Sequence, residues 1–169
     1  MLKCRRKTRG FTAIELTVVL GIAAILASIG YPRWEEYHNR MTVNEIANQL
    51  STTFRDARDE ALLEQCEMSF EVDNEQRQIS VWRHNSTDFE LYKRVSFANE
   101  VFICGTGKIT FLIGRGGYIT GASGISVQSS SLAGYSIAYY DVPVTSKAYS
   151  IEVHVLITSD GRVSLGDSL

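Results

Sequence analysis

The feature that most constrains this chain is an apolar run close to its first residues. No charged residue occurs from Leu16 to Ile29, and between Phe11 and Gly30 the single charge is Glu15. About 20 residues, each rising roughly 1.5 Å, cross a hydrocarbon core of roughly 30 Å. The run therefore predicts a membrane-spanning helix segment at residues 11–31.

A basic stretch precedes the run. Residues 1–10 contain five Lys or Arg side chains and no acidic residue, and an excess of positive charge on one flank holds that flank in the cytoplasm. We therefore expect a single-pass protein whose first residues lie inside the cell and whose remainder is exported.

Two simpler explanations compete with a dedicated assembly signal. A secretory signal peptide needs a small-residue cleavage site after the apolar run, and Ala27-Ser28-Ile29 is a poor one. An ordinary signal anchor gives no reason for a carboxylate such as Glu15 one helical turn into the membrane, where a charge is costly and indicates function. Cutting between Gly10 and Phe11 would create an amine that could neutralise Glu15 of a neighbouring subunit.

The residues around that junction, G-F-T-x-x-E-L from Gly10 onward, resemble the class III signal of type IV pilins and pseudopilins. The resemblance implies that a prepilin peptidase removes residues 1–10, cutting after Gly10 and N-methylating Phe11. It also implies that Glu15 aligns subunits in a filament. Ala13 stands where that family most often has Leu or Ile.

Helical patterning continues beyond the apolar run. We expect Pro32 to kink the helix without ending it, because apolar residues resume at spacings of three and four. Residues 32–64 then form an amphipathic, exported half, and the helix from Phe11 to Glu64 would be roughly 80 Å long. The residues of the apolar stripe, predicted to pack under a globular head, are Val43, Ile46, Ala47, Leu50, Phe54, Ala57, Ala61 and Leu62.

Residues 65–169 change to a period of two, with turn signals between short apolar runs. We predict about eight antiparallel strands in a β-sheet or β-sandwich head, with Val142-Pro143 breaking a strand that begins at Tyr135. Residues 98–108 and 119–131 are predicted loops, and two short strands that overlap the second stay open as alternatives, at Tyr118-Ile119-Thr120 and around Ile125-Ser126-Val127. The expected fold class is α+β, a long N-terminal helix packed on an antiparallel head.

Three short segments of this region resemble the H-type minor pseudopilins of type II secretion and the FimT- and FimU-like minor pilins. They are RDARDEA at Arg55–Ala61, ITFLIG at Ile109–Gly114, and DGRV at Asp160–Val163. The resemblance implies a minor subunit located in the bacterial inner membrane with a periplasmic head. Its implied partners are prepilin peptidase, other pilins or pseudopilins, an inner-membrane assembly platform and membrane lipid.

The cysteines leave two possibilities open. Cys4 would be lost with residues 1–10, whereas Cys66 and Cys104 would remain as an even pair in an oxidising compartment. They could form a disulfide or remain two buried thiols. The histidines have no metal-ligand spacing, so we expect neither a metal nor a cofactor.

The sequence gives little support for a catalytic function or for nucleic-acid binding. The serine run Ser129-Ser130-Ser131 has no nucleophile-elbow spacing, and the glycine-rich segment at 114–117 fits no phosphate-binding pattern. Some FimT-like minor pilins bind DNA through a basic C-terminal tail, but Arg162 is the one basic residue here and acidic residues lie near it. A strand-ending turn is the favoured interpretation of Arg162.

We therefore predict a non-enzymatic minor pilin or pseudopilin that primes or caps a type IV pilus or a secretion pseudopilus. Three alternatives stay open: a major pilin, a DNA-binding minor pilin for DNA uptake, and a periplasmic enzyme held by a signal anchor.

Overall fold

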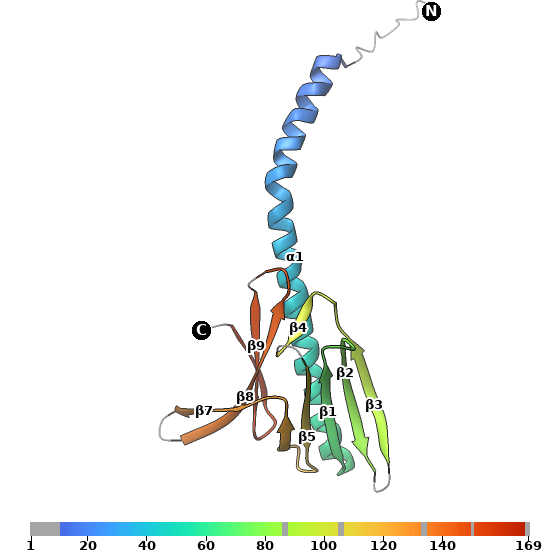
Figure 1. The fold of residues 1–169 in the computed structure, drawn as a ribbon, viewed down its shortest axis with the longest axis vertical. Coiled ribbons are helices and arrows are strands. Elements are labelled where there is room, and N and C mark those ends of the chain that lie inside the picture. Colours follow the sequence, from blue (N-terminus) through green and yellow to red (C-terminus); the bar gives the residue numbers. More distant parts are fainter. Residues whose placement is uncertain (1–10, 86–87, 105–106, 133–134, 150, 168–169) are drawn as a thin grey trace, which may run out of the picture. The chain divides into compact units, whose positions relative to one another are not determined.

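A computed structural model of the chain describes residues 11–85, 88–104, 107–132, 135–149 and 151–167 (Figure 1). One long helix precedes a series of antiparallel strands, so the predicted α+β fold is confirmed. The elements are α1 (Ala13–Glu64), β1 (Glu67–Asp73), β2 (Gln78–His84), β3 (Phe89–Ser96), β4 (Val101–Ile103), β5 (Lys108–Ile113), β6 (Ile119–Ser123), β7 (Val127–Leu132), β8 (Tyr135–Ser146), β9 (Glu152–Thr158) and β10 (Val163–Asp167).

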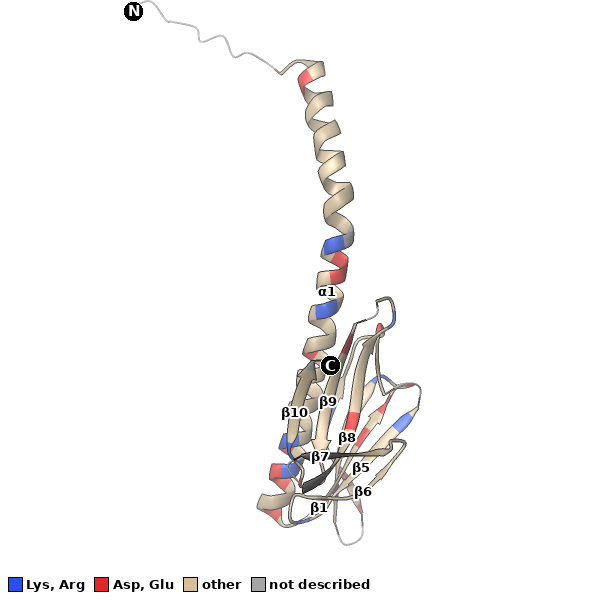
Figure 2. Cartoon of the chain, turned by 90° about the vertical axis from the view of Figure 1, so that its left-hand side faces the viewer, with Lys and Arg blue, Asp and Glu red and all other residues tan. Residues whose placement is uncertain are grey.

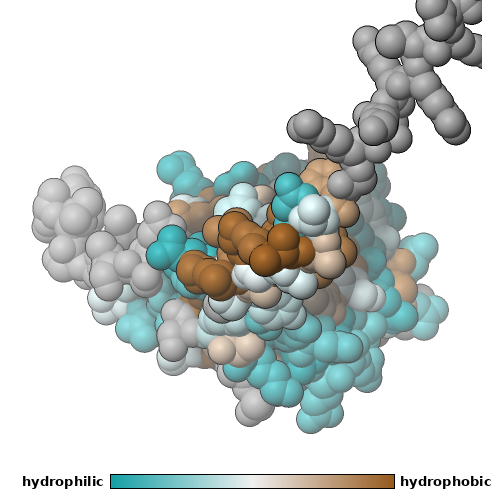
Figure 3. All heavy atoms as spheres, turned by 90° about the horizontal axis from the view of Figure 1, so that it is seen from above, coloured by the Kyte–Doolittle hydropathy of each residue, from teal (hydrophilic) through white to brown (hydrophobic). Residues whose placement is uncertain are grey.

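The chain divides into two compact units at His38, and each is described by itself. The described part of the first unit is the beginning of α1, whose large apolar side chains are exposed, Ile14 by 72% and Leu26 by 65%. Figure 2 shows a long uncharged stretch of α1 after one acidic position, and Figure 3 shows hydrophobic side chains uncovered at the surface. By length and composition α1 can cross a membrane.

The second unit, from Asn39 onward, contains two antiparallel sheets. The first sheet has the strand order β3-β2-β1-β5-β6, and the second has the order β10-β9-β8-β4, with β7 paired to the first half of β8. In the first sheet Phe70 is the partner of Val81 on β2 and of Phe111 on β5. The hairpin predicted for β1 and β2 is therefore confirmed.

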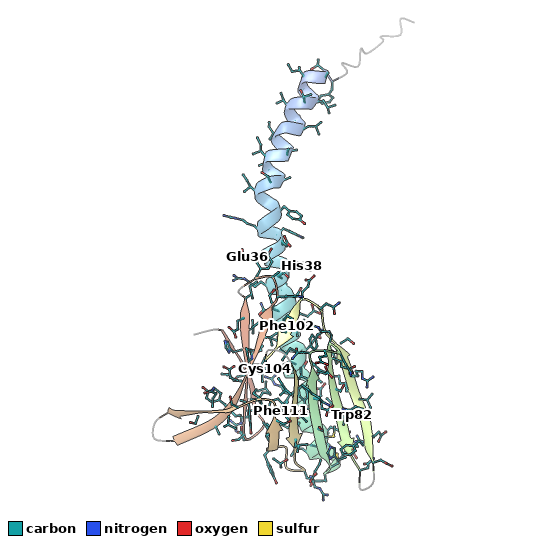
Figure 4. All side chains as sticks on the ribbon, in the orientation of Figure 1. Glu36, His38, Trp82, Phe102, Cys104 and Phe111 are labelled. Atoms are coloured by element: carbon teal, nitrogen blue, oxygen red, sulfur yellow. The ribbon has the colours of Figure 1, made fainter. Side chains whose placement is uncertain are left out.

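Aromatic side chains join the second half of α1 to both sheets. The ring of Phe54 meets Phe70 edge to face, with centroids 5.2 Å apart, and Phe111 at 5.8 Å. Phe111 also meets Tyr140 of the second sheet at 5.3 Å, and it lies in the middle of the head in Figure 4. Phe54, Phe70 and Phe111 are fully buried.

The predicted apolar stripe of α1 is the face that packs against the sheets. Its members from Val43 to Ala61 are buried, whereas Leu62 is 37% exposed and marks the edge of the contact. Ion pairs border the packed face, because Glu60 pairs with Arg83 of β2 and Asp56 pairs with Lys93 of β3 at 2.6 Å.

Pro143 does not break a strand, which corrects the sequence prediction. Strand β8 runs from Tyr135 to Ser146, and Pro143 is the partner of His154 on β9. The carbonyl of Pro143 accepts a hydrogen bond from the N–H of Cys104, just past the end of β4. The N–H and C=O of one residue face the same neighbouring strand, so the donor that Pro143 lacks faces β4. The missing N–H therefore removes a hydrogen bond on the β4 side of β8. The pairing of β8 with β9 is unaffected.

The structure contains ten strands in its described part, two more than about eight. Strand β4 lies in the predicted loop 98–108, and all of β6 and most of β7 lie in the predicted loop 119–131. Strand β4 has three residues and pairs only with β8, while β7 is rich in serine, so neither segment has a clear alternation of apolar residues.

Replacing Phe54 by Ala should remove the α1 side chain that packs on Phe70 of β1 and Phe111 of β5. We expect Phe54→Ala to lower the free energy of unfolding by about 3–5 kcal/mol, measured by urea unfolding of the full chain in detergent. Leu63 is 78% exposed on the same helix, and Leu63→Ala should change the value by less than about 0.5 kcal/mol. Equal effects of the two substitutions would contradict this packing.

Candidate functional site

The first turn of α1 is closed by a reciprocal pair of polar side chains. The helix begins at Ala13, and the backbone N–H and the hydroxyl of Thr12 each donate to Oε2 of Glu15 at 2.9 Å. The N–H of Glu15 in turn donates to the Thr12 hydroxyl at 3.3 Å. This arrangement is a capping box, in which two side chains satisfy backbone donors that a helix start leaves unpaired.

Sequence reasoning missed this role for Glu15, although the signal was present. The spacing of Thr12 and Glu15 is the S/T-x-x-E pattern that opens many helices. Both contacts to Thr12 use Oε2 of the carboxylate, so Oε1 is directed to neither Thr12 group. The side chain is exposed. An acid held in this way keeps an oxygen available to a cation from another molecule.

The other predicted processing residues are less constrained by the structure. Gly10 lies outside the described residues, and Phe11 is 87% exposed. Cleavage and methylation at this junction therefore stay predictions. The helix continues through position 32, so Pro32 does not end it. The kink at Pro32 stays a prediction.

Of the two possibilities that the sequence leaves open for Cys66 and Cys104, the structure has the second, with both thiols free. Cys66 directly precedes β1, while Asn74 directly follows β1 and binds the backbone of Ile103 through both atoms of its amide, at 2.7 and 3.0 Å. A seven-residue strand is roughly 20 Å long, and a disulfide needs Cα atoms within about 7 Å. The two cysteines lie at opposite ends of β1.

Arg162 lies in the turn between β9 and β10, which agrees with the strand-ending interpretation. Its side chain is 81% exposed and its Nε lies 3.1 Å from Oδ2 of Asp160. A hydrogen bond from the Thr158 hydroxyl lowers the pKa of Asp160, so this carboxylate is ionised at neutral pH. Asp160 therefore offsets the charge that a phosphate group would need from Arg162.

Two of the three segments that carried the resemblance to minor subunits are in contact, and the third ends in the turn at 114–117 that also reaches this contact. Arg55 donates to the carbonyl of Val163 at 2.8 Å, and Arg58 donates through Nε to the carbonyl of Gly117 at 3.2 Å. Gly117 follows the ITFLIG strand, and Val163 ends the DGRV segment. Two arginines of α1 thus hold together the turns at the ends of the two sheets.

Two glycines make this contact possible. Gly117 and Gly161 both have positive φ angles, 72° and 78°. A Cβ atom on Gly161 would lie 2.2 Å from the carbonyl oxygen of Gly117 and 2.9 Å from atoms of Arg58. We call Arg55, Arg58, Gly117, Gly161 and Val163 the arginine–glycine clamp. Its hydrogen bonds to backbone carbonyls indicate a structural role.

Within the described ranges no group of three or more His, Cys, Asp or Glu side chains is placed to hold a metal ion. His154 of β9 lies 2.8 Å from Asp141 of β8, whereas His84 of β2 packs against the ring of Phe89. A surface pocket beside the β1–β2 turn is lined by Asn74, Glu75, Arg77, Phe102 and Gly107. The buried Asn74 amide hydrogen-bonds to backbone groups of Ile103 and Gly107 there, and the Arg77 guanidinium lies 4.4 Å from the Phe102 ring.

The clamp makes a prediction about Gly161. We expect Gly161→Ala to lower the free energy of unfolding by at least about 2 kcal/mol, because a Cβ is strained at positive φ and collides with the Gly117 carbonyl. Gly166 is the matched control, since a Cβ there would meet Leu156 at an ordinary 3.7 Å. If urea unfolding gives Gly161→Ala and Gly166→Ala the same stability, the close approach is wrong.

The cysteine geometry makes a second prediction. Alkylation of the denatured, unreduced protein should add one group to each of Cys66 and Cys104, detected by peptide mass spectrometry. In the native protein Cys104 should react slowly at neutral pH, because burial, together with the charge of Asp141, raises the pKa of its thiol and lowers the thiolate fraction. A peptide pair linked through Cys66 and Cys104 would contradict both results.

No protein-family model matches the sequence. Prepilin peptidase-dependent protein D of Escherichia coli (strain K12) is 48% identical over 40 residues, a stretch that covers 24% of this chain and 27% of that relative.

Two solved structures are similar to this chain in fold. The minor pseudopilin EpsH from the Type 2 Secretion System of Vibrio cholerae matches with a TM-score of 0.55 and 8% identity, over 75% of this chain and 97% of that one. The type IV minor pilin FimU of Pseudomonas aeruginosa (strain PAO1) matches with a TM-score of 0.53 and 14% identity, over 77% and 92%. The chain therefore has the fold of the minor pseudopilins and type IV minor pilins, as the resemblance in its sequence implied.

Proposed function

We propose that this chain is a minor subunit of a type IV pilus or a type II secretion pseudopilus. A prepilin peptidase removes residues 1–10, the subunit waits in the inner membrane with its head in the periplasm, and it is then extracted into a filament that it primes or caps. The partners in this proposal are other pilins or pseudopilins, the inner-membrane assembly platform and membrane lipid.

One observation carries the proposal. The beginning of α1 exposes apolar side chains on all sides, has no charge from Leu16 to Pro32, and carries one carboxylate, Glu15, in its first turn. A helix that is apolar all round belongs in lipid or among other helices. A membrane anchor explains the apolar surface and the capping box explains an acid in the first turn, whereas a filament subunit also gives a use to the carboxylate oxygen that Thr12 does not bind.

Glu15 has a defined task in this proposal. Removal of residues 1–10 leaves an ammonium group on Phe11, and Glu15 of an adjacent subunit offers the carboxylate oxygen that Thr12 does not bind. Ion pairing between the two groups makes their burial among packed helices tolerable, since an unpaired charge in an apolar medium is costly. The pair also fixes the axial offset between neighbouring helices.

Processing can be tested on the protein extracted from membranes. Mass spectrometry of its N-terminal peptide should find a chain that begins at Phe11 with one added methyl group. Deleting the prepilin peptidase should leave Met1 and the whole basic stretch in place. A mature terminus after Ser28 or Gly30 would contradict the proposal and indicate an ordinary secretory signal.

Assembly can be tested with Glu15→Ala. The variant should insert and be cleaved like the wild type but should be about tenfold or more depleted from purified filaments, because the terminal amine of its neighbour loses its counter-charge. Ser28→Ala is the matched control, since Ser28 is an exposed polar residue of the same helix segment that bonds only its own helix at Ile25. Wild-type levels of Glu15→Ala in filaments would refute the pairing.

A further inference from the structure

The β7 strand forms an arm with the beginning of β8. Residues 127–132 pair with residues 135–140, whereas β9 pairs with β8 only from Tyr139 onward. Figure 1 shows this two-stranded arm extending away from the rest of the head. A hairpin of two strands has little stability of its own in water. A third strand paired with the arm would therefore stabilise it.

The outer edge of β7 presents backbone groups that are ready for such a strand. The carbonyl of Ala138 accepts a hydrogen bond from Ser159, on the side of β8 that faces away from β7. Ala138 is the partner of Ser129, so this pair does not exchange hydrogen bonds and the N–H and C=O of Ser129 face outward. By alternation Val127 also faces outward, and Gln128 faces β8. No described strand pairs with this outer edge.

The arm lacks the charges that normally protect an open edge. From Gly116 to Tyr140 the sequence contains no Asp, Glu, Lys, Arg or His. By contrast, the edge strand of the first sheet, β3, carries Glu90, Lys93 and Arg94, and its pairing with β2 contains an irregularity at Val81 and Trp82. Charges and bulges are the usual means of preventing strands from joining at an edge. The edge strand β3 therefore carries features that prevent strand addition, and the β7 edge has no charged side chain of this kind.

We propose that the outer edge of β7 accepts a β-strand from the head of a neighbouring subunit in the same assembly. Backbone hydrogen bonds to Val127 and Ser129 hold the added strand. The partner strand is extended and uncharged, with small or β-branched side chains, because it must lie beside Val127, Gln128 and Ser129 without a counter-charge. This inference rests on the proposed function, which supplies the neighbouring subunit.

Hydrogen exchange on the wild-type chain tests the edge directly. In the isolated full-length protein in detergent the Ser129 amide should exchange rapidly and the Gln128 amide slowly, because only Gln128 faces β8. In purified assemblies the Ser129 amide should slow by about tenfold or more, measured by mass spectrometry with residue-level fragmentation. An unchanged Ser129 rate in assemblies that contain the chain would overturn the inference.

A proline substitution tests whether the edge is needed. Ser129→Pro removes an outward N–H, so the pairing of β7 with β8 is retained, as for proline on an edge strand generally. We expect about tenfold less of this variant in assemblies. Ser129→Ala keeps the N–H and should assemble like the wild type. Equal incorporation of the two variants would count against strand addition.

The outcomes separate this inference from the proposed function. Absence of the wild-type chain from filaments would refute the function, whereas presence of Ser129→Pro at the wild-type level would refute only the strand addition. If the Ser129 amide becomes protected in the purified chain alone as its concentration is raised, the added strand comes from a second copy outside any assembly, and our assignment to a neighbouring subunit of the assembly is wrong.

Discussion

The first half of α1 has an apolar surface whose exposure to water is unfavourable. Its large apolar side chains are more than half exposed in the single chain, and full burial of each is worth about 1.5–3 kcal/mol. A helix of this length collects many such side chains, so its surface must be covered by lipid or by other helices. The same property makes one helix suitable for two environments in turn, since lipid tails and apolar side chains offer it similar contacts.

The second half of the same helix is apolar on one face only. Its apolar stripe is covered by the head, where Phe54, Phe70 and Phe111 form one aromatic cluster with the two sheets. Charged side chains of α1 complete the contact, through Arg55 and Arg58 in the arginine–glycine clamp and through Asp56 and Glu60 at β3 and β2. One helix therefore has two parts with different surfaces, an apolar part that is uncovered in the single chain and a part that the head covers.

The features with a strong local signal were predictable from the sequence. The apolar run, the stripe from Val43 to Ala61 and the hairpin of β1 and β2 follow from the spacing of apolar residues alone. Strand β4 and the continuity of β8 through Pro143 were not predictable, because both depend on which strand lies beside which. The position of Cys104 at the far end of β1 from Cys66 likewise follows from tertiary packing, which a count of cysteines cannot supply.

In the candidate site, too, some features have a local sequence signal and others depend on tertiary packing. The spacing of Thr12 and Glu15 carried enough information for a capping box, whereas the directions of the backbone groups in β7 became visible only through the hydrogen bond between Ser159 and Ala138. Four of the five clamp residues lie in segments that carried the family resemblance, but the sequence did not show that these segments are in contact. The arginines of α1 bind the backbone carbonyls of Gly117 and Val163. Only glycine at position 161 allows its turn to approach the Gly117 carbonyl so closely.

The most direct test of the account is a cryo-electron microscopy structure of an assembled filament that contains this chain. If Glu15 pairs as proposed, its carboxylate lies within about 4 Å of the terminal ammonium on Phe11 of an adjacent subunit, a distance typical of an ion pair. A Glu15 side chain that faces lipid, with no positive group near it, would contradict the account.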